Sequence, residues 1–369
     1  MNSRFTWVLL VVLGLAGCGE PEAPADQGFA GLGTAADGFS QVTGEREVSF
    51  PEDHAMHPDY RLEWWYVTAN LEDETGRQFG VQWTLFRQAL IADGEPAGWQ
   101  DGQVWMAHAG LTRADQHHHA ERFGRSGGGQ AGVRTDPRYD VWLDDWQLTS
   151  IQPPVAELAD SEDPLAHISV RARSDDFAFE LALQSDRPLV RHGEAGYSVK
   201  SERGQASYYF SQPFYQANGE LTLDDGERVQ VRGQAWLDRE WSSQPLAPEQ
   251  TGWDWFSLHL DSGDKLMLFR LREQDDPDSF FAGTWVTPDG ESTRLTPDQI
   301  ELAPQSSTRV AGRDVPTHWT VAVPDKGVRL ETEPLNAHAW MGASVPYWEG
   351  PVSVSGSHDG RGYLEMTGH

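Results

Sequence analysis

The chain has 369 residues and a formal net charge of −29, from 57 acidic against 28 basic residues. A surface this negative is repelled by phosphate groups, which excludes nucleic acid as an expected partner. The single cysteine excludes a framework of intrachain disulfides.

The first residues have the three parts of a lipoprotein signal. Arg4 supplies a positive charge, and the apolar run from Phe5 to Leu15 is too short to span a bilayer. Small residues then lead into Cys18, the pattern that a lipoprotein signal peptidase cuts. We therefore expect a signal peptide over residues 1–17 and a lipid anchor on Cys18, which would hold the protein to a membrane.

The residues after Cys18 predict where the anchor holds the protein. Gly19 stands where an Asp would indicate retention in the inner membrane, so the periplasmic side of the outer membrane is preferred over the inner membrane. Residues 18–37 are rich in Gly, Pro and Ala and show no periodicity, which predicts a flexible tether.

The rest of the chain predicts an all-β protein. Its 16 Trp, 15 Phe and 9 Tyr fall in short runs between Gly- and Pro-containing turns, and no segment has a long helical apolar period. A β-hairpin pattern over residues 64–87 recurs over 253–270, and both hairpins end in Leu-Phe-Arg. The alternation over 229–238 recurs over 352–365. These repeats indicate a duplication.

Each half would be a meander of antiparallel strands, which buries one face and loses its edges by closing into a barrel. We predict two tandem barrels packed together, the first over residues 38–242 and the second over 243–369. The polar stretch from Arg113 to Asp140, with His117-His118-His119, is expected to be a mobile surface loop. Adjacent histidines in such a loop are not expected to form a closed metal site.

A first cluster of candidate residues precedes and begins a predicted strand. His54 and His57 lie before Glu63-Trp64-Trp65-Tyr66. Alternation places Glu63 and Trp65 on one face, and a buried carboxylate needs a partner, for which Arg61 is the nearest candidate. For the two histidines a hydrogen-bond network is favoured over a metal site.

A second cluster, from Trp236 to Trp241, lies at the junction of the halves. Alternation sets Asp238 and Glu240 on one face, opposite Arg239 and Trp241. Paired carboxylates on one face shift each other's pKa, as acid–base catalysis requires, but a salt-bridge cluster between the domains is an equal alternative.

A third candidate is His108, within an apolar strand, where a hydrogen-bonded core residue is the alternative to a catalyst. The chain lacks the Gly-x-Ser-x-Gly, His-Glu-x-x-His, phosphate-loop and dinucleotide motifs. This argues against a serine hydrolase, a zinc protease and a nucleotide-dependent enzyme. No cofactor and no metal are expected.

These segments resemble the AttH-like, CrtC-type lipocalin-like family, which contains carotenoid 1,2-hydratases and exported proteins described as secreted hydrolases. The resemblance runs from Gly38 to the C-terminus. It rests on His54, His57-Pro58-Asp59, Glu63-Trp64-Trp65-Tyr66, Met106-Ala107-His108, Trp236-Leu237-Asp238-Arg239-Glu240-Trp241 and Gly252-Trp253-Asp254-Trp255-Phe256. It implies two lipocalin-like barrels and, by analogy with the hydratases, protonation of an alkene inside an aromatic cavity. Those hydratases have a segment with His and Asn where this chain has Asp238-Arg239-Glu240.

Two functional hypotheses stay open. The first is a lipid-anchored periplasmic protein that binds an apolar or amphipathic small molecule, as an accessory to an ABC export system. The second is a hydratase, isomerase or hydrolase acting on an isoprenoid or lipid-like substrate, with Asp238 and Glu240 as acid and base. The expected ligand-binding residues are His54, His57, Glu63, Trp65, Tyr66, His108, Trp236, Trp241, Trp253 and Trp255.

Overall fold

The structure is a computed structural model that describes residues 32, 36–92, 102–151, 163–274 and 276–369. The predicted signal peptide, the predicted lipidation site Cys18 and most of the predicted tether lie outside the described residues. Among the described residues, no helix is both long enough and apolar enough to cross a membrane.

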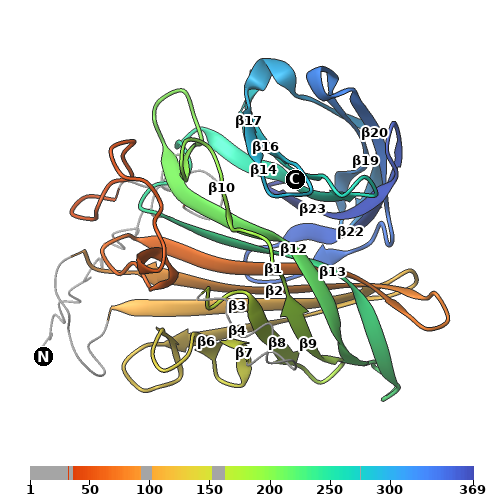
Figure 1. The fold of residues 1–369 in the computed structure, drawn as a ribbon, viewed down its shortest axis with the longest axis horizontal. Coiled ribbons are helices and arrows are strands. Elements are labelled where there is room, and N and C mark those ends of the chain that lie inside the picture. Colours follow the sequence, from red (N-terminus) through yellow and green to blue (C-terminus); the bar gives the residue numbers. More distant parts are fainter. Residues whose placement is uncertain (1–31, 33–35, 93–101, 152–162, 275) are drawn as a thin grey trace, which may run out of the picture.

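The first half of the chain forms a 13-stranded antiparallel sheet that curls on itself (Figure 1). Its strand order is β4-β3-β2-β1-β13-β12-β9-β8-β7-β6-β5, with β10 and β11 also paired to β12. The strands are β1 (Leu62–Asp73), β2 (Gln78–Ala89), β3 (Gln103–Arg113), β4 (His117–Arg125), β5 (Ala131–Arg134), β6 (Asp140–Leu143), β7 (Trp146–Ser150), β8 (His167–Arg173), β9 (Ala178–Gln184), β10 (Val190–Arg191), β11 (Tyr197–Val199), β12 (Ala206–Thr222) and β13 (Arg228–Ser242).

The second half forms a 10-stranded antiparallel sheet, which curls into a ring in Figure 1. Its order is β17-β16-β15-β14-β23-β22-β20-β19-β18, with β21 paired to β22. The strands are β14 (Gln250–Leu260), β15 (Lys265–Glu273), β16 (Asp276–Val286), β17 (Ser292–Leu295), β18 (Glu301–Val310), β19 (Arg313–Val323), β20 (Val328–Pro334), β21 (Trp340–Met341), β22 (Tyr347–Gly356) and β23 (Gly360–Thr367). The predicted fold, two tandem lipocalin-like barrels, is confirmed.

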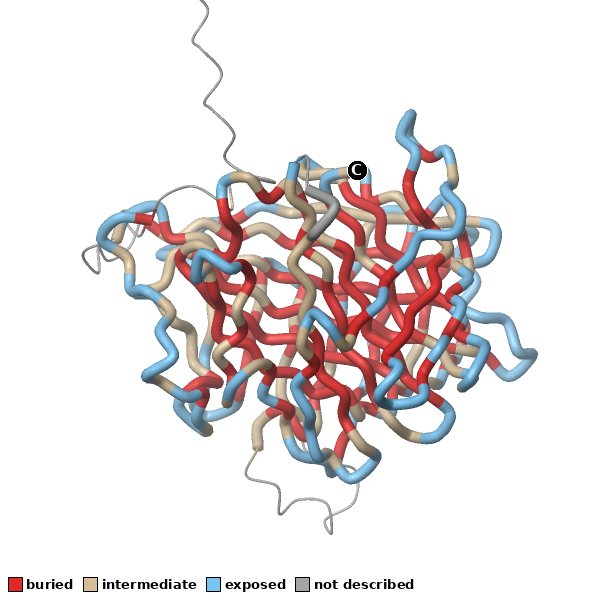
Figure 2. The backbone as a smooth tube through the Cα atoms, turned by 90° about the horizontal axis from the view of Figure 1, so that it is seen from above, coloured by how far each residue is buried: buried red, intermediate tan, exposed pale blue. Residues whose placement is uncertain are grey.

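Alternation along the strands divides the apolar residues between three cores. In β1, Trp65 and Val67 point into the first barrel, while Tyr66 packs against the second barrel. In β14, Phe256 and Leu258 point into the second barrel. The third core lies between the barrels and takes residues from both halves. In Figure 2 the buried residues follow the strands and the exposed residues gather in the turns.

β2 of the first barrel lies close against β22 and β23 of the second barrel. A Cβ atom on Gly80 would lie 2.5 Å from Cγ of Pro351 and 2.6 Å from the hydroxyl oxygen of Tyr363. Only glycine fits at this point, because a methyl group has no room there.

The stretch from Arg113 to Asp140 corrects one prediction. It was expected to be a mobile loop, but it contains β4, which pairs with β3 along its whole length, and β5. Polar residues dominate β4 because most of its side chains are only partly buried at a sheet edge. The described residues contain no group of three or more His, Cys, Asp or Glu placed to hold a metal ion.

Candidate functional site between the barrels

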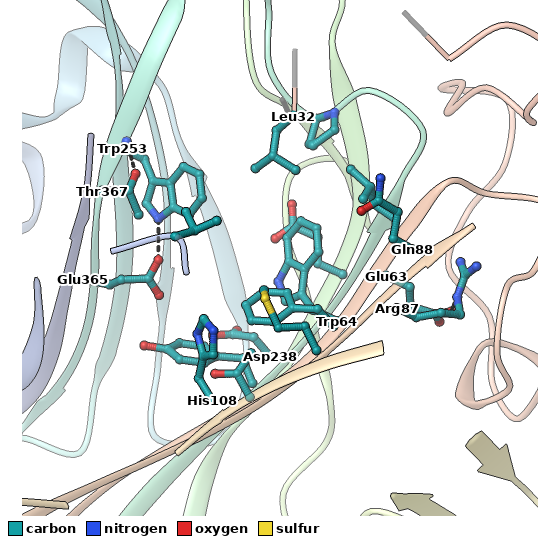
Figure 3. Close-up of a pocket in the computed structure, with 18 of the residues that line it drawn as sticks. Leu32, Glu63, Trp64, Arg87, Gln88, His108, Asp238, Trp253, Glu365 and Thr367 are labelled. Carbon is teal, nitrogen blue, oxygen red and sulfur yellow. Dashed lines mark hydrogen bonds and ion pairs between the residues drawn. The ribbon is translucent and has the colours of Figure 1, made fainter. Parts of the chain in front are cut away.

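A cavity of about 340 Å³ lies between the two barrels. Strands of both halves line it, so neither barrel could form it alone (Figure 3). Its aromatic walls are made by Trp64, Tyr66, Phe86, Trp105, Phe123, Tyr209, Trp253, Trp255, Phe269 and Tyr347. Its carboxyl groups include Asp238, Glu240 and Glu365. Such a mixture of apolar surface and a few polar groups is typical of small-molecule sites.

The two halves contribute equivalent positions to this cavity. In the first barrel, Glu63 lies opposite Arg87, and the next residue, Trp64, lies opposite Phe86 and Glu240. The duplication thus places an acid beside a tryptophan on the cavity wall.

The second barrel repeats this arrangement. Asp254 lies opposite Arg270, and the next residue, Trp255, lies opposite Phe269 and Glu365. Glu365 is therefore the second-half counterpart of Glu240. Both glutamates line the same cavity.

Asp238 is a buried carboxyl without a cationic partner among the described residues. Its Oδ1 accepts hydrogen bonds from Ser211 Oγ and from Trp236 Nε1, the latter at 2.9 Å. Its Oδ2 accepts no hydrogen bond from the described residues. Burial raises the pKa of Asp238 to about 7, and it outweighs the lowering effect of Ser211, Trp236 and the nearby Tyr209 hydroxyl. Asp238 can therefore hold a proton near neutral pH.

Ser211, whose hydroxyl donates a hydrogen bond to Asp238, is itself fixed by further hydrogen bonds. His192 Nε2 lies 2.6 Å from Ser211 Oγ, and His192 Nδ1 lies 2.8 Å from Thr284 Oγ1 of the second barrel. Burial lowers the pKa of His192 to about 3, so its ring is neutral. The orientation of Asp238 thus depends on residues of both barrels.

Glu240 stands two residues from Asp238 on the same face of β13, but its surroundings differ. Lys200 Nζ lies 2.9 Å from Glu240 Oε1, and Ser207 Oγ donates a hydrogen bond to the same oxygen. The Lys200 ammonium also lies over the rings of Tyr209 and Phe269. Of the two carboxyls, Glu240 is the one paired with a cation.

Glu365 faces the cavity from β23. It accepts a hydrogen bond of 2.7 Å from Trp253 Nε1, drawn as a dashed line in Figure 3. Burial raises the pKa of Glu365 to about 7, and the charge of Glu240 adds to this rise. The cavity thus holds two carboxyls, Asp238 and Glu365, that titrate near neutral pH, one from each barrel.

Glu63, an expected ligand-binding residue, belongs to an ion network inside the first barrel. Its expected partner was Arg61, but the ion pairs that form run to Arg87 Nε, at 3.1 Å, and to Arg239 Nη2, at 2.8 Å. His57 Nδ1 lies 2.8 Å from Glu63 Oε1. Burial would raise the pKa of Glu63, but the two guanidinium groups and His57 lower it well below its usual range. Figure 3 shows Glu63 and Arg87 side by side at the edge of the cavity.

The other expected ligand-binding residues divide into three groups. Tyr66, His108, Trp253 and Trp255 line the cavity. His54, His57, Trp65 and Trp241 lie in or against the core of the first barrel, where His57 stacks on Trp241 at 3.8 Å. Trp236 is buried behind Asp238 and reaches it only through its indole N–H. The hydrogen-bond network favoured for His57 is present, since its Nε2 lies 3.0 Å from Asp53.

Sequence reasoning missed Lys200, Tyr209 and Glu365. The repeat could have identified Glu365, because Trp255 and Leu-Phe-Arg in the second half match Trp64 and Leu-Phe-Arg in the first. The others follow from no local pattern.

This fold and site define a class of double lipocalin-like barrels with an aromatic, acid-containing cavity at the junction. The chain belongs to the AttH-like family, whose model matches residues 41–369. The resemblance inferred from the sequence is confirmed. Comparison with curated proteins finds no match.

Solved structures extend the comparison. A crystal structure of an AttH protein from Nitrosomonas europaea is 33% identical, with a TM-score of 0.77, over 89% of this chain and 99% of that one. Kievitone hydratase from Nectria haematococca is 16% identical, with a TM-score of 0.64, over 89% and 95%. CghA with Sch210972 is 15% identical, with a TM-score of 0.51, over 93% and 97%. The last two show a shared fold.

Proposed function

We propose that the cavity between the barrels binds an apolar or amphipathic small molecule and that Asp238 protonates it. The observation that carries this proposal is the state of Asp238. It is a buried carboxyl on an aromatic wall, and its Oδ2 accepts no hydrogen bond from the described residues. The nearby ammonium of Lys200 pairs with Glu240 instead. A salt-bridge cluster would have paired both carboxyls of β13.

The chemistry follows from these groups. The Asp238 proton adds to one carbon of a double bond, and the other carbon becomes a cation. Ring faces stabilise a cation, and Trp64, Tyr66 and Trp255 line this cavity. Addition of water to the cation, with loss of one proton, gives a hydrated product, while loss of a proton from the neighbouring carbon gives an isomer. We therefore favour a hydratase or isomerase over a hydrolase. Kievitone hydratase, a protein of the same fold, supports this reaction class.

The test is turnover in deuterated water with a panel of isoprenoid and unsaturated lipid substrates, with products followed by mass spectrometry. We expect one solvent deuteron to enter the product. Asp238→Asn should abolish this incorporation while cavity binding of the substrate persists. Asp224→Asn, on the turn after β12, is the matched control and should leave turnover unchanged. Unchanged turnover in Asp238→Asn would contradict the proposed role of this acid.

A second function, binding and delivery without chemistry, is favoured by apolar side chains near the cavity. Phe123 is 58% exposed and lines the cavity, and the exposed Leu90 and Ile91 follow β2, two and three residues after the lining residue Gln88. Exposed apolar residues next to a cavity suit exchange of an apolar ligand with a membrane or a partner. On this alternative, a protein anchored through Cys18 on the periplasmic side serves an ABC export system.

Delivery has its own test. The protein is purified with its bound lipids, the lipids are identified by mass spectrometry, and transfer of that lipid class to vesicles is timed. Phe123→Ser should slow the transfer several-fold without changing the amount bound. Recovery of an empty protein that takes up no lipid from vesicles would defeat this second function.

A further inference from the structure

A line of polar side chains runs from the cavity into the interface between the barrels. Its inner end is Glu365, which faces the cavity. The Tyr66 hydroxyl is near enough to Glu365 to lower the pKa of that carboxyl. The same hydroxyl donates a hydrogen bond to Glu349 Oε1. Glu349 is fully buried, and its Oε2 accepts no hydrogen bond from the described residues. The Tyr347 hydroxyl is near enough to lower the pKa of this carboxyl. Glu349 therefore has one oxygen available to carry a proton towards Tyr347.

The line continues from Tyr347 to the surface. The Tyr347 hydroxyl lies 2.9 Å from His108 Nδ1, and His108 Nε2 lies 3.0 Å from Glu121 Oε1. Glu121 also accepts hydrogen bonds from the backbone N–H and the hydroxyl of Ser344. The Glu121 side chain is 18% exposed and therefore reaches solvent. His108 is 1% exposed, so it lies inside the line.

We propose that this line is a proton relay between the cavity and solvent. The relay consists of Glu365, Tyr66, Glu349, Tyr347, His108 and Glu121. Successive members come from β23, β1, β22, β22, β3 and β4, so that the relay crosses between the barrels three times.

Every member has the chemistry that a relay needs. A protonated carboxyl, a phenol and a neutral imidazole can each give one proton and accept another. Burial raises the pKa of Glu349 well above its usual range, and the charge of Glu365 adds to this. At the outer end, the hydrogen bond from His108 lowers the pKa of Glu121 to about 2. Protonated Glu349, inside the relay, is thus connected to ionised Glu121 at its outer end.

Other ionisable groups face this line. Glu240 raises the pKa of Glu365. Tyr363 is close to Glu349. His119 is close to both His108 and Glu121. Burial and its histidine neighbours lower the pKa of His119, so no additional cation stands beside the relay there.

The purpose of the relay rests on the proposed function. In a hydration, the Asp238 proton forms the new C–H bond and water forms the new C–O bond. The proton that the added water loses needs an acceptor. The ionised form of Glu365, a cavity carboxyl with no cationic partner among the described residues, can take it. The reaction then leaves Asp238 ionised and Glu365 protonated. The relay returns the proton of Glu365 to solvent while an apolar molecule fills the cavity mouth, and Asp238 regains its own proton after product release.

The hydrogen bonds behind Asp238 make a useful contrast. The line from Asp238 through Ser211 and His192 ends on Thr284, which is buried. It orients the acid but does not reach solvent. His192 is thus a buried histidine in a line that ends inside the protein, and it serves as a matched control for His108.

The experiment measures proton exchange without substrate. The cavity is filled with the neutral apolar probe N-phenyl-naphthylamine, whose fluorescence reports occupancy, and a pH jump is followed by the infrared band of protonated carboxyls. The part of this infrared signal that is lost in Glu365→Gln belongs to the Glu365 carboxyl, and we call it the Glu365 component. We expect His108→Gln to slow this component by about 100-fold, the lower end of the contribution of a positioned proton-transfer group. His192→Gln should leave its rate unchanged.

Two further variants separate a relay from a structural role. Glu121→Gln changes only the partly exposed end and should also slow the Glu365 component. In His108→Ala, added imidazole should restore the rate in proportion to its concentration, which repacking of the interface would not produce. An unchanged rate in His108→Gln with the probe bound would overturn the relay alone. A probe that does not bind would overturn the proposed cavity function together with the relay.

Discussion

The Lys200 ammonium lies 2.9 Å from Glu240 Oε1. This contact distinguishes Glu240 from Asp238, the other carboxyl on the same face of β13. Glu240 is the carboxyl paired with this cation. Asp238 remains the uncharged acid, because burial raises its pKa and no cation among the described residues counters that rise.

This relationship predicts the behaviour of Lys200→Met. Removing the ammonium leaves Glu240 as a buried charge without its cation, which costs about 3 kcal/mol of unfolding free energy. Urea denaturation at neutral pH should show the loss. The double variant K200M/E240Q should recover much of it, because the remaining group is then neutral. Lys326→Met, at an exposed site, is the control. Equal losses in the single and double variants would contradict the pairing.

The raised pKa of Asp238 predicts how stability depends on pH. The folded protein holds the Asp238 proton up to about pH 7, whereas the unfolded chain releases it near pH 4, so this group lowers stability as the pH rises between these values. Asp238→Asn should therefore be more stable than the wild type at pH 8, by about 2 to 4 kcal/mol. At pH 4 this pKa-linked gain should vanish. Thermal unfolding of both proteins across this range measures it, and a difference that does not change with pH would disprove the assignment.

Gly80 sets how closely the barrels approach. A methyl group there would meet Pro351 and Tyr363 at about 2.5 Å, so Gly80→Ala should force the barrels apart and lower the unfolding free energy by about 1 to 3 kcal/mol. Gly110→Ala is the matched control on β3, since its nearest neighbour is the flexible sulfur of Met341 at 3.4 Å. The cavity should lose affinity for N-phenyl-naphthylamine in Gly80→Ala only. Equal affinity in both variants would show that the cavity does not depend on this contact.

The sequence predicts a large part of the fold because each signal for it is local. Period-two alternation and turn residues place the hairpins, and the repeat places two similar halves in one chain. Alternation also assigns Asp238 and Glu240 to one face of β13. The stretch containing β4 was misjudged because a partly exposed edge strand has the composition of a loop.

The remaining parts of the site depend on register and on packing between the barrels. Glu63 was recognised as a carboxylate that needs a partner, but its partners lie on β2 and β13, and only strand register brings them opposite it. Lys200 and Glu349 reach the cavity region from distant segments. No local pattern marks them, because a cavity between two barrels is a product of the docking of the halves.

The ion network of Glu63 gives the last prediction. Arg239 and Glu63 are both fully buried, and the guanidinium group of Arg239 also lies 3.9 Å from the ring centre of Trp65. Arg239→Met keeps much of the apolar contact but leaves Glu63 short of one cation, so the unfolding free energy should fall by about 3 to 5 kcal/mol. Arg232→Met, on the same strand but with a 74% exposed side chain, should change it by less than about 1 kcal/mol.

The pH dependence of this variant has the opposite sign to that of Asp238→Asn. The pKa of Glu63 is lowered in the folded protein, so its network stabilises the fold above about pH 4 and the stabilisation is lost as the pH falls. The difference between Arg239→Met and the wild type should therefore be largest at neutral pH and shrink in acid. Urea titrations at pH 7 and at pH 2.5 measure both differences, because the stabilisation is lost as the pH falls from the ordinary pKa of a glutamate towards the lowered pKa of Glu63. A deficit of equal size at both pH values would assign the role of Arg239 to packing on Trp65 rather than to its charge.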